Sequence, residues 1–241
     1  MIRPLPLLAF IALVAAACTE QGATATAPPS GTTASAFPAA DRPVSDIVSP
    51  EWSSEAERDA ADESGQLVRR LGIAPGMTVA DIGAGNGYHT VRLSPVVGRE
   101  GRVIAQDITP NYLADLRTRV TKAGLGNISF VLGAPDDPKL PAGAVDLALM
   151  VHMYHEIEQP YAFLHNLARA LKPGARVAVT DLDRSTDRHG TPPALLRCEF
   201  EAVGYRQLSS EPLKGDVGYL SVFAAPAALP APGAIVPCRA R

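Results

Sequence analysis

The feature that most constrains the fold is a short glycine-rich segment, Val79-Ala80-Asp81-Ile82-Gly83-Ala84-Gly85-Asn86-Gly87. The apolar run before it predicts a buried strand over 78–82, and the residues after it have helical period over 88–97. Gly83 and Gly85 remove side chains where the backbone must turn sharply and approach a ligand closely. The start of the helix adds free N–H groups. The segment therefore predicts a cofactor-binding turn.

Short apolar runs alternate with longer stretches of helical period from about residue 50 onward. This alternation predicts an α/β fold, a doubly wound, mostly parallel seven-stranded sheet with helices on both faces. Ser54 and Glu57 are spaced as a capping box and predict the start of the first helix. The predicted strands are 78–82, 102–106, 128–132, 145–151, 176–181, 205–208 and 219–224, and the predicted helices are 54–72, 88–97, 110–123, 159–171 and 192–203.

The glycine spacing bears on which cofactor the turn binds. A dinucleotide-binding turn has the pattern G-x-G-x-x-G, whose third glycine lets a pyrophosphate rest on the helix N-terminus. Counted from Gly83, that third position is Tyr88, and Gly87 comes one residue too early. Asp81 would also put a carboxylate beside a phosphate. The pattern argues against a nucleotide-dependent reductase and favours a cationic, zwitterionic ligand.

The same segment resembles motif I, D-x-G-x-G-x-G, of the class I S-adenosylmethionine-dependent methyltransferases, and the resemblance extends over about residues 50–225. It implies a Rossmann-like sheet with S-adenosyl-L-methionine as cofactor. Asp107 ends the second predicted strand and matches the acidic residue that takes both ribose hydroxyls in that family, a task for which a carboxylate has two acceptor oxygens. The residues implied around the methionine part are Asp81, Gly83, Ala84 and Gly85.

Two further segments are similar to the same family. Asp146 opens the fourth predicted strand, where the family usually has an aspartate, and residues 171–177 resemble its "LKPGG" turn with Ala175 in place of the second glycine. That turn is structural, so it supports the fold. Many relatives carry an Asp-Ala pair against the adenine after the third strand. Here the resemblance implies adenine contacts at Ala134 and Asp136.

The fourth predicted strand delivers the sequence Val-His-Met-Tyr-His-Glu, residues 151–156, to the sheet edge where ligands bind in open α/β folds. Methyl transfer depends mainly on aligning the acceptor, and a general base is useful but not obligatory. Relatives often carry a histidine or aromatic pair here, so His155 is the candidate catalytic base, with a packing histidine as the alternative. The order of His152, His155 and Glu156 is not that of a zinc protease motif, and no metal site is predicted.

The two ends of the chain have different compositions from the middle. Residues 1–18 combine Arg3, a short apolar run and three alanines before Cys18, which predicts a secretory signal rather than a membrane-spanning helix. Cys18 resembles the lipobox cysteine of bacterial lipoproteins, which implies a lipid anchor in the periplasm or cell envelope; ordinary cleavage to a free protein is the alternative. Residues 19–49 predict a flexible linker, 50–225 the methyltransferase domain, and 226–241 a disordered tail.

The formal net charge of −3 lacks the cationic excess that nucleic-acid binding requires, so a small-molecule methyl acceptor is the expected partner. Cys198 and Cys238 form an even pair, and a disulfide and two unlinked cysteines stand as alternatives. Two functions follow from the resemblance. One is a methyltransferase acting on a small molecule, and the other is a non-catalytic module that binds S-adenosylmethionine or S-adenosylhomocysteine in the cell envelope.

Overall fold

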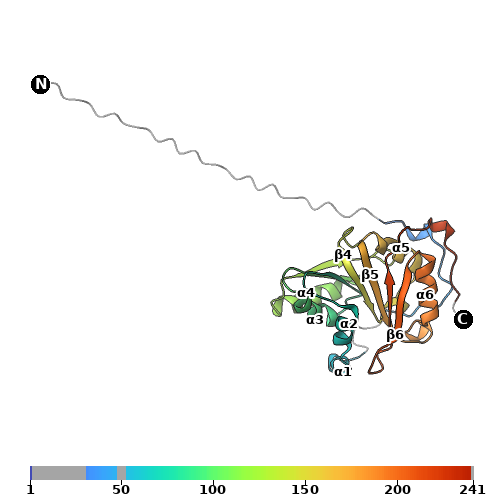
Figure 1. Cartoon of the computed structure of the whole chain (residues 1–241), viewed down its shortest axis with the longest axis horizontal. Helices are drawn as coiled ribbons and strands as arrows, with labels where there is room; N and C mark the ends of the chain where they lie inside the picture. Colours follow the sequence, from blue (N-terminus) through green and yellow to red (C-terminus); the bar gives the residue numbers. More distant parts are fainter. Residues whose placement is uncertain (2–30, 48–52, 240–241) are drawn as a thin grey trace.

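The computed structural model describes Met1, residues 31–47 and residues 53–239. Its centre is a sheet with helices packed around it (Figure 1). The sheet has seven strands in the order β3-β2-β1-β4-β5-β7-β6. The first five strands pair in parallel, and β7 runs antiparallel between β5 and β6. The predicted sheet is therefore confirmed. The strands are β1 (Thr78–Ile82), β2 (Arg102–Asp107), β3 (Ile128–Leu132), β4 (Val145–Val151), β5 (Leu171–Asp181), β6 (Arg206–Pro212) and β7 (Tyr219–Ala224).

Helices cover both faces of the sheet because its strands are apolar on both sides. Successive residues of a strand point to opposite faces. Val79 packs in one apolar cluster with Leu67 and Leu93, whereas Ala80 packs in another with Phe163 and Phe200. The helices are α1 (Glu55–Ala60), α2 (Glu63–Leu71), α3 (Tyr88–Val97), α4 (Pro110–Lys122), α5 (Pro160–Ala168) and α6 (Pro193–Ala202).

The largest departures from the predicted boundaries are in the helix 54–72 and in strand β5. The expected helix 54–72 begins with the predicted Ser54–Glu57 capping box but is divided into α1 and α2, because Asp62 takes a left-handed φ of 51°. Strand β5 begins at Leu171, ahead of the predicted 176. The register with β4 shifts between Val145 and Leu147, and this irregularity lets the strand pass through the Lys-Pro-Gly turn.

Residues 31–47, here called the N-terminal strap, lie against the domain. Phe37 packs in the apolar cluster beneath α5 and α6. The backbone N–H of Gly31 donates to Asp137 Oδ2 at 3.0 Å, and that of Thr32 donates to Asn166 Oδ1 at 2.9 Å. The predicted flexible linker 19–49 is therefore wrong over 31–47. A few anchoring side chains fix a segment whose average composition is that of a linker.

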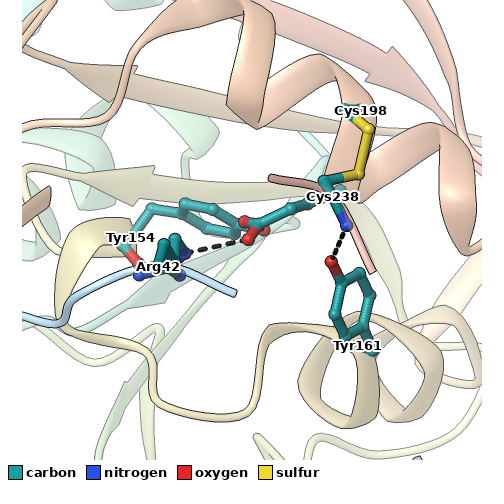
Figure 2. Close-up of a disulfide and its surroundings, with 6 residues drawn as sticks. Arg42, Tyr154, Tyr161, Cys198 and Cys238 are labelled. Carbon is teal, nitrogen blue, oxygen red and sulfur yellow. Dashed lines mark hydrogen bonds and ion pairs between the residues drawn. A yellow bond between two sulfur atoms is a disulfide. The ribbon is translucent and has the colours of Figure 1, made fainter. Parts of the chain in front are cut away.

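The C-terminal segment also differs from the prediction of a disordered tail over 226–241. It is described as far as residue 239, and Ile235 is buried in the same apolar cluster. Cys238 forms a disulfide with Cys198 of α6, and its N–H donates to Tyr161 Oη at 2.6 Å (Figure 2). The structure thus selects the disulfide among the two alternatives for the cysteines.

No helix among the described residues is both long and apolar enough to cross a bilayer. The predicted export segment 1–18, with Cys18 at its end, lies outside the described residues except for Met1.

Candidate functional site

A cavity of about 550 Å³ opens at the carboxyl ends of the parallel strands. Because these strands run in one direction, the residues that follow β1, β2, β3 and β4 meet at the same edge of the sheet. Helix α1 and the N-terminal strap complete the wall. The residues that line it from the strand ends include Asp81, Gly83, Ala84, Gly85, Gln106, Asp107, Ala134, Val151, His152 and Met153.

The glycine-rich turn forms one wall of the cavity. Gly83, Gly85 and Gly87 have φ values of 67°, 53° and 84°, a region that side chains disfavour. A Cβ atom on Gly83 would lie 2.8 Å from Met153 Cγ, so the turn needs glycine for space as well as for conformation. Gly83, Ala84 and Gly85, which are predicted to contact the cofactor, lie in this wall.

Asp107 links the ends of β1 and β2. Its Oδ2 accepts the N–H of Gly85 at 2.9 Å, and its Oδ1 accepts the N–H of Thr109 at 2.8 Å. The carboxylate is 7% exposed and lines the cavity. These contacts leave each oxygen with a further lone pair, so the group can still accept two hydroxyl donors.

Asp81 lies at the floor of the site beside the glycine turn. It is 3% exposed, and its Oδ2 accepts the hydroxyl of Thr90 at 2.5 Å. Burial raises the pKa of Asp81 above its ordinary value, although the charge of His89 and the hydrogen bond from Thr90 oppose the shift. A cation bound in the cavity would favour the ionised carboxylate.

Only one of the two predicted adenine contacts, Ala134 and Asp136, lines the cavity. Ala134 lines the cavity, as expected. Asp136 is not among the lining residues, because its Oδ2 accepts the N–H of Ala34 from the strap at 3.0 Å. The assignment of Asp136 to the adenine therefore stays a prediction, with a contact to the strap as its observed role. The sequence could not reveal that a distant segment, 102 positions earlier, uses this carboxylate.

His155, the predicted catalytic base, also lies outside the cavity lining. Its side chain is buried, and Nδ1 is 3.1 Å from both carboxylate oxygens of Asp181. The neighbouring residues His152, Met153 and Glu156 line the cavity instead. His155 and Glu156 are neighbours in the short 3-10 helix Tyr154–Glu156, whose tight turn points consecutive side chains in different directions, and His152 precedes it with a left-handed φ of 54°.

A buried charged cluster that sequence reasoning missed stands beside the glycine turn. Glu63 Oε1 lies 2.8 Å from Arg58 Nη2, 3.2 Å from His89 Nε2 and 3.6 Å from His152 Nε2. Burial by itself raises the pKa of Glu63, but the hydrogen bonds from Arg58, His152 and His89 outweigh it and hold this pKa far below its ordinary value. Glu63 therefore remains ionised and compensates Arg58.

Three members of this cluster, Arg58, His89 and His152, line the cavity. Burial lowers the pKa of His89, although the hydrogen bond to Glu63 and the charge of Asp81 oppose this shift. The guanidinium carbon of Arg58 also lies 3.8 Å from the ring centroid of Tyr88, a cation–π contact. The cluster could not be predicted from a sequence motif, because charged residues on an amphipathic helix usually form its solvent-exposed face.

Two buried polar atoms of lining residues indicate that the cavity is built for a polar ligand. His89 Nδ1 and Gln106 Nε2 have no hydrogen-bond partner among the residues that the structure describes. An unpaired buried polar atom costs about 1–3 kcal/mol, and a bound ligand can remove that cost. Together with the carboxylates of Asp81 and Asp107, they suit a ligand that carries hydroxyl, amino and cationic groups.

Known proteins match the central part of the chain. Residues 79–174 match the model of a family described as a methyltransferase domain. The chain is 30% identical over 114 residues to the ubiquinone/menaquinone biosynthesis C-methyltransferase UbiE of Shewanella sp. (strain ANA-3), covering 47% of this chain and 45% of that protein. It is 27% identical over 158 residues to the arsenite methyltransferase of Halobacterium salinarum, covering 64% and 40%. The chain thus spans less than half the length of these curated relatives.

A solved structure supports the fold independently of these sequence matches. The crystal structure of a SAM dependent methyltransferase from Aquifex aeolicus has a TM-score of 0.61 and 24% identity, covering 72% of this chain and 98% of that one. The sheet order, the matched family model and the motif at residues 81–87 agree with one another. Residues 79–174 are thus similar to a methyltransferase domain, and they lie in a Rossmann-like sheet of the order β3-β2-β1-β4-β5-β7-β6.

Proposed function

We propose that this protein transfers a methyl group from S-adenosylmethionine to a small-molecule acceptor in the cell envelope. The observation that carries the proposal is the cavity in which the glycine turn and Asp107 form one wall and His152, Met153 and Glu156 form another. Its volume of about 550 Å³ is in the range of small-molecule sites. When bound, S-adenosylmethionine supplies a sulfonium methyl group for in-line displacement by a nucleophile.

The protein's part in this reaction is to bind and orient. Asp107 accepts the ribose hydroxyls, and the backbone of Gly83 to Gly85 allows close approach of the amino-acid part. The carboxylate of Asp81 attracts the cationic groups of S-adenosylmethionine. The guanidinium of Arg58 attracts the carboxylate of its amino-acid part. Positioning of this kind supplies most of what a methyl transfer requires.

The acceptor lies toward the end of β4 in this proposal, where the strap residues Ser45, Asp46 and Ile47 also line the cavity. His152 takes the acceptor's proton in place of the predicted His155, because it is the histidine of that segment which reaches the wall. Its Nε2 lies 3.6 Å from Glu63 Oε1, and this negative charge stabilises the imidazolium that proton uptake produces.

The cell-envelope location rests on two observations. The sequence of residues 1–18 has the order of an export signal, with Cys18 in the place of a lipidated cysteine. The Cys198–Cys238 disulfide supports an oxidising compartment, since disulfides are rare in reducing ones. Mass spectrometry of the mature N-terminus tests this part, with a diacylglyceryl group on Cys18 as the expected result and an uncleaved Met1 as the opposing one.

Calorimetric titration with S-adenosylmethionine and S-adenosylhomocysteine tests the cofactor site, and methyl transfer to a library of small acceptors tests turnover. Asp107→Ala should weaken cofactor binding by about 1–3 kcal/mol, because charge-assisted hydrogen bonds are lost. Asp115→Ala, on the exposed face of α4, is the matched control and should bind as the unmodified protein does. Binding without any turnover would favour the non-catalytic module, and an unchanged affinity in Asp107→Ala would remove the ribose assignment.

A further inference from the structure

A second group of possible ligands lies beside the cofactor cavity. One ligand atom from each of His155, Glu156 and His189 lies within 4.8 Å of the others. The first two residues belong to the 3-10 helix Tyr154–Glu156, and His189 follows the 3-10 helix Thr186–Arg188. The two imidazole rings meet edge to face, with their centroids 5.4 Å apart. Two imidazoles and a carboxylate are a ligand set of zinc and related divalent ions.

The surroundings of His155 hold its ring in the orientation that a metal ligand needs. Asp181 accepts at 3.1 Å from His155 Nδ1, and it also accepts from Thr191 Oγ1 at 2.7 Å and from the N–H of Leu182 at 2.9 Å. With Nδ1 directed at this carboxylate, Nε2 is the ring nitrogen that remains to face the cluster. A carboxylate behind a histidine in this way is the usual support of a metal-ligating imidazole.

His189 is held in place by its backbone rather than by its ring. Its φ is 55°, in the left-handed region, and its N–H donates to Ser45 Oγ of the strap at 3.1 Å. Ring atom Nδ1 is buried and has no hydrogen-bond partner within the described part of the chain. Strained backbone and an unsatisfied buried nitrogen both cost free energy, and a bound ion would offset the second cost.

We infer that His155, Glu156 and His189 bind a divalent transition-metal ion, with zinc as the reference ion. Three protein ligands leave a coordination position for a further oxygen or sulfur ligand. Glu156 also lines the cofactor cavity, so the ion would lie at the cavity wall. The role of that position rests on the proposed function, in which an acceptor's oxygen or sulfur would occupy it and lose its proton more readily.

The test is metal binding in the absence of cofactor. The full chain, stripped of metal with a chelator, is titrated with zinc chloride in a calorimeter, and cobalt(II) is added separately to record visible absorption. We expect one ion per chain and the absorption bands of a low-coordinate cobalt site. His189→Asn should lower zinc affinity by more than about tenfold. Removing a residue that only hydrogen-bonds to a metal ligand already lowers metal affinity by about tenfold or more, and His189 is a ligand itself. Asparagine tolerates the left-handed φ of this position, so the backbone is retained.

Glu156→Gln removes the charged ligand without changing its size and should weaken zinc binding to a similar degree. His165→Asn is the matched control, because this histidine lies on α5 and contacts Phe37 instead of the cluster; it should bind zinc normally. Circular dichroism confirms that each variant is folded. The inference is overturned if the folded protein binds no stoichiometric zinc, or if His189→Asn and Glu156→Gln bind it unchanged.

The cofactor titration separates this outcome from that of the proposed function. Metal-stripped protein that binds S-adenosylmethionine but no zinc contradicts the metal site alone. Protein that binds zinc but neither S-adenosylmethionine nor its demethylated product contradicts the proposed function and leaves the metal site standing.

Discussion

Arg42 and Glu199 are 157 positions apart, yet Nε of one lies 2.8 Å from Oε1 of the other and neither side chain is exposed. The pair joins the N-terminal strap to α6. Tyr154 completes the arrangement, because its hydroxyl donates to Glu199 Oε2 at 2.8 Å. Arg42 also donates to the carbonyl of Ile157 at 3.0 Å. The strap is thus fixed to the segment that follows β4, and its next residues, Ser45 to Ile47, reach the cofactor cavity.

Arg42→Met should destabilise the protein by about 3–5 kcal/mol, because removal of one partner leaves a buried charge uncompensated. Burial already raises the pKa of Glu199, opposed by Arg42 and by the Tyr154 hydrogen bond. Chemical denaturation of the single variant and of Arg42→Met combined with Glu199→Gln measures the effect. The double variant should recover part of the loss, since no unpaired charge remains. Equal stability of the single variant and the unmodified protein would contradict the inferred role of the pair.

The disulfide should stabilise the fold by restricting the unfolded chain. It joins residues 40 positions apart, for which loop-closure entropy gives about 4 kcal/mol. Replacing both Cys198 and Cys238 with serine should therefore lower the melting temperature by roughly 8–16 °C in a domain of this size. Adding a reductant to the unmodified protein provides the control and should reproduce the shift. A melting temperature that neither treatment moves would show that the link contributes nothing measurable.

The sequence predicted the sheet, and it predicted the glycine turn and Asp107 that line one wall of the cavity, because these features depend on local patterns. The turn at Gly83 to Gly87 needs particular backbone conformations that only certain residues adopt, and Asp107 follows from the end of a recognisable strand. The end of the site next to β4 could not be predicted in the same way. Whether His152 or His155 reaches the cavity depends on the left-handed backbone at His152 and on the 3-10 turn that follows, which the residue types alone do not specify.

Long-range contacts account for the remaining differences. Asp136 looked like a ligand residue, but its carboxylate serves the N–H of Ala34. The strap looked like a linker because two anchoring residues, Phe37 and Arg42, are diluted among alanines, threonines and prolines. The anchoring role of Phe37 and Arg42 can be recognised only when their partners are known, which are an apolar cluster for Phe37 and Glu199 for Arg42. Segments of this kind are where composition is the weakest guide to structure.

Gly83→Ala should weaken cofactor binding as well as stability. A left-handed φ costs a non-glycine residue about 1–2 kcal/mol, and the added Cβ would also press on Met153. Gly143→Ala is the matched control, because Gly143 has a similar φ of 58° but open space around the position of a Cβ. The control should lose stability by a comparable amount while its affinity for S-adenosylhomocysteine is unchanged. Equal affinities in both variants would argue against close approach of the ligand at Gly83.

Asp81 gives the cofactor affinity a specific pH dependence. Burial raises its pKa in the free protein, so the carboxyl takes up a proton at a higher pH than an exposed aspartate does. A cationic ligand favours the ionised form, and binding must therefore release a proton in that pH range. Affinity should be full above the raised pKa and should fall as the pH drops through it.

Calorimetry in two buffers of different ionisation enthalpy measures the released proton directly, and repeating the titration at several pH values locates the fall in affinity. Asp81→Asn keeps an acceptor for the Thr90 hydroxyl but carries no charge, so its affinity should be lower and should lack this fall. The stability of the folded protein should change with pH in the opposite direction to the cofactor affinity. A raised folded pKa means that the folded protein binds more protons, so the unmodified protein loses stability as the pH rises from the ordinary aspartate value through the raised one, and Asp81→Asn does not. A pH dependence that survives in Asp81→Asn would assign it to another group.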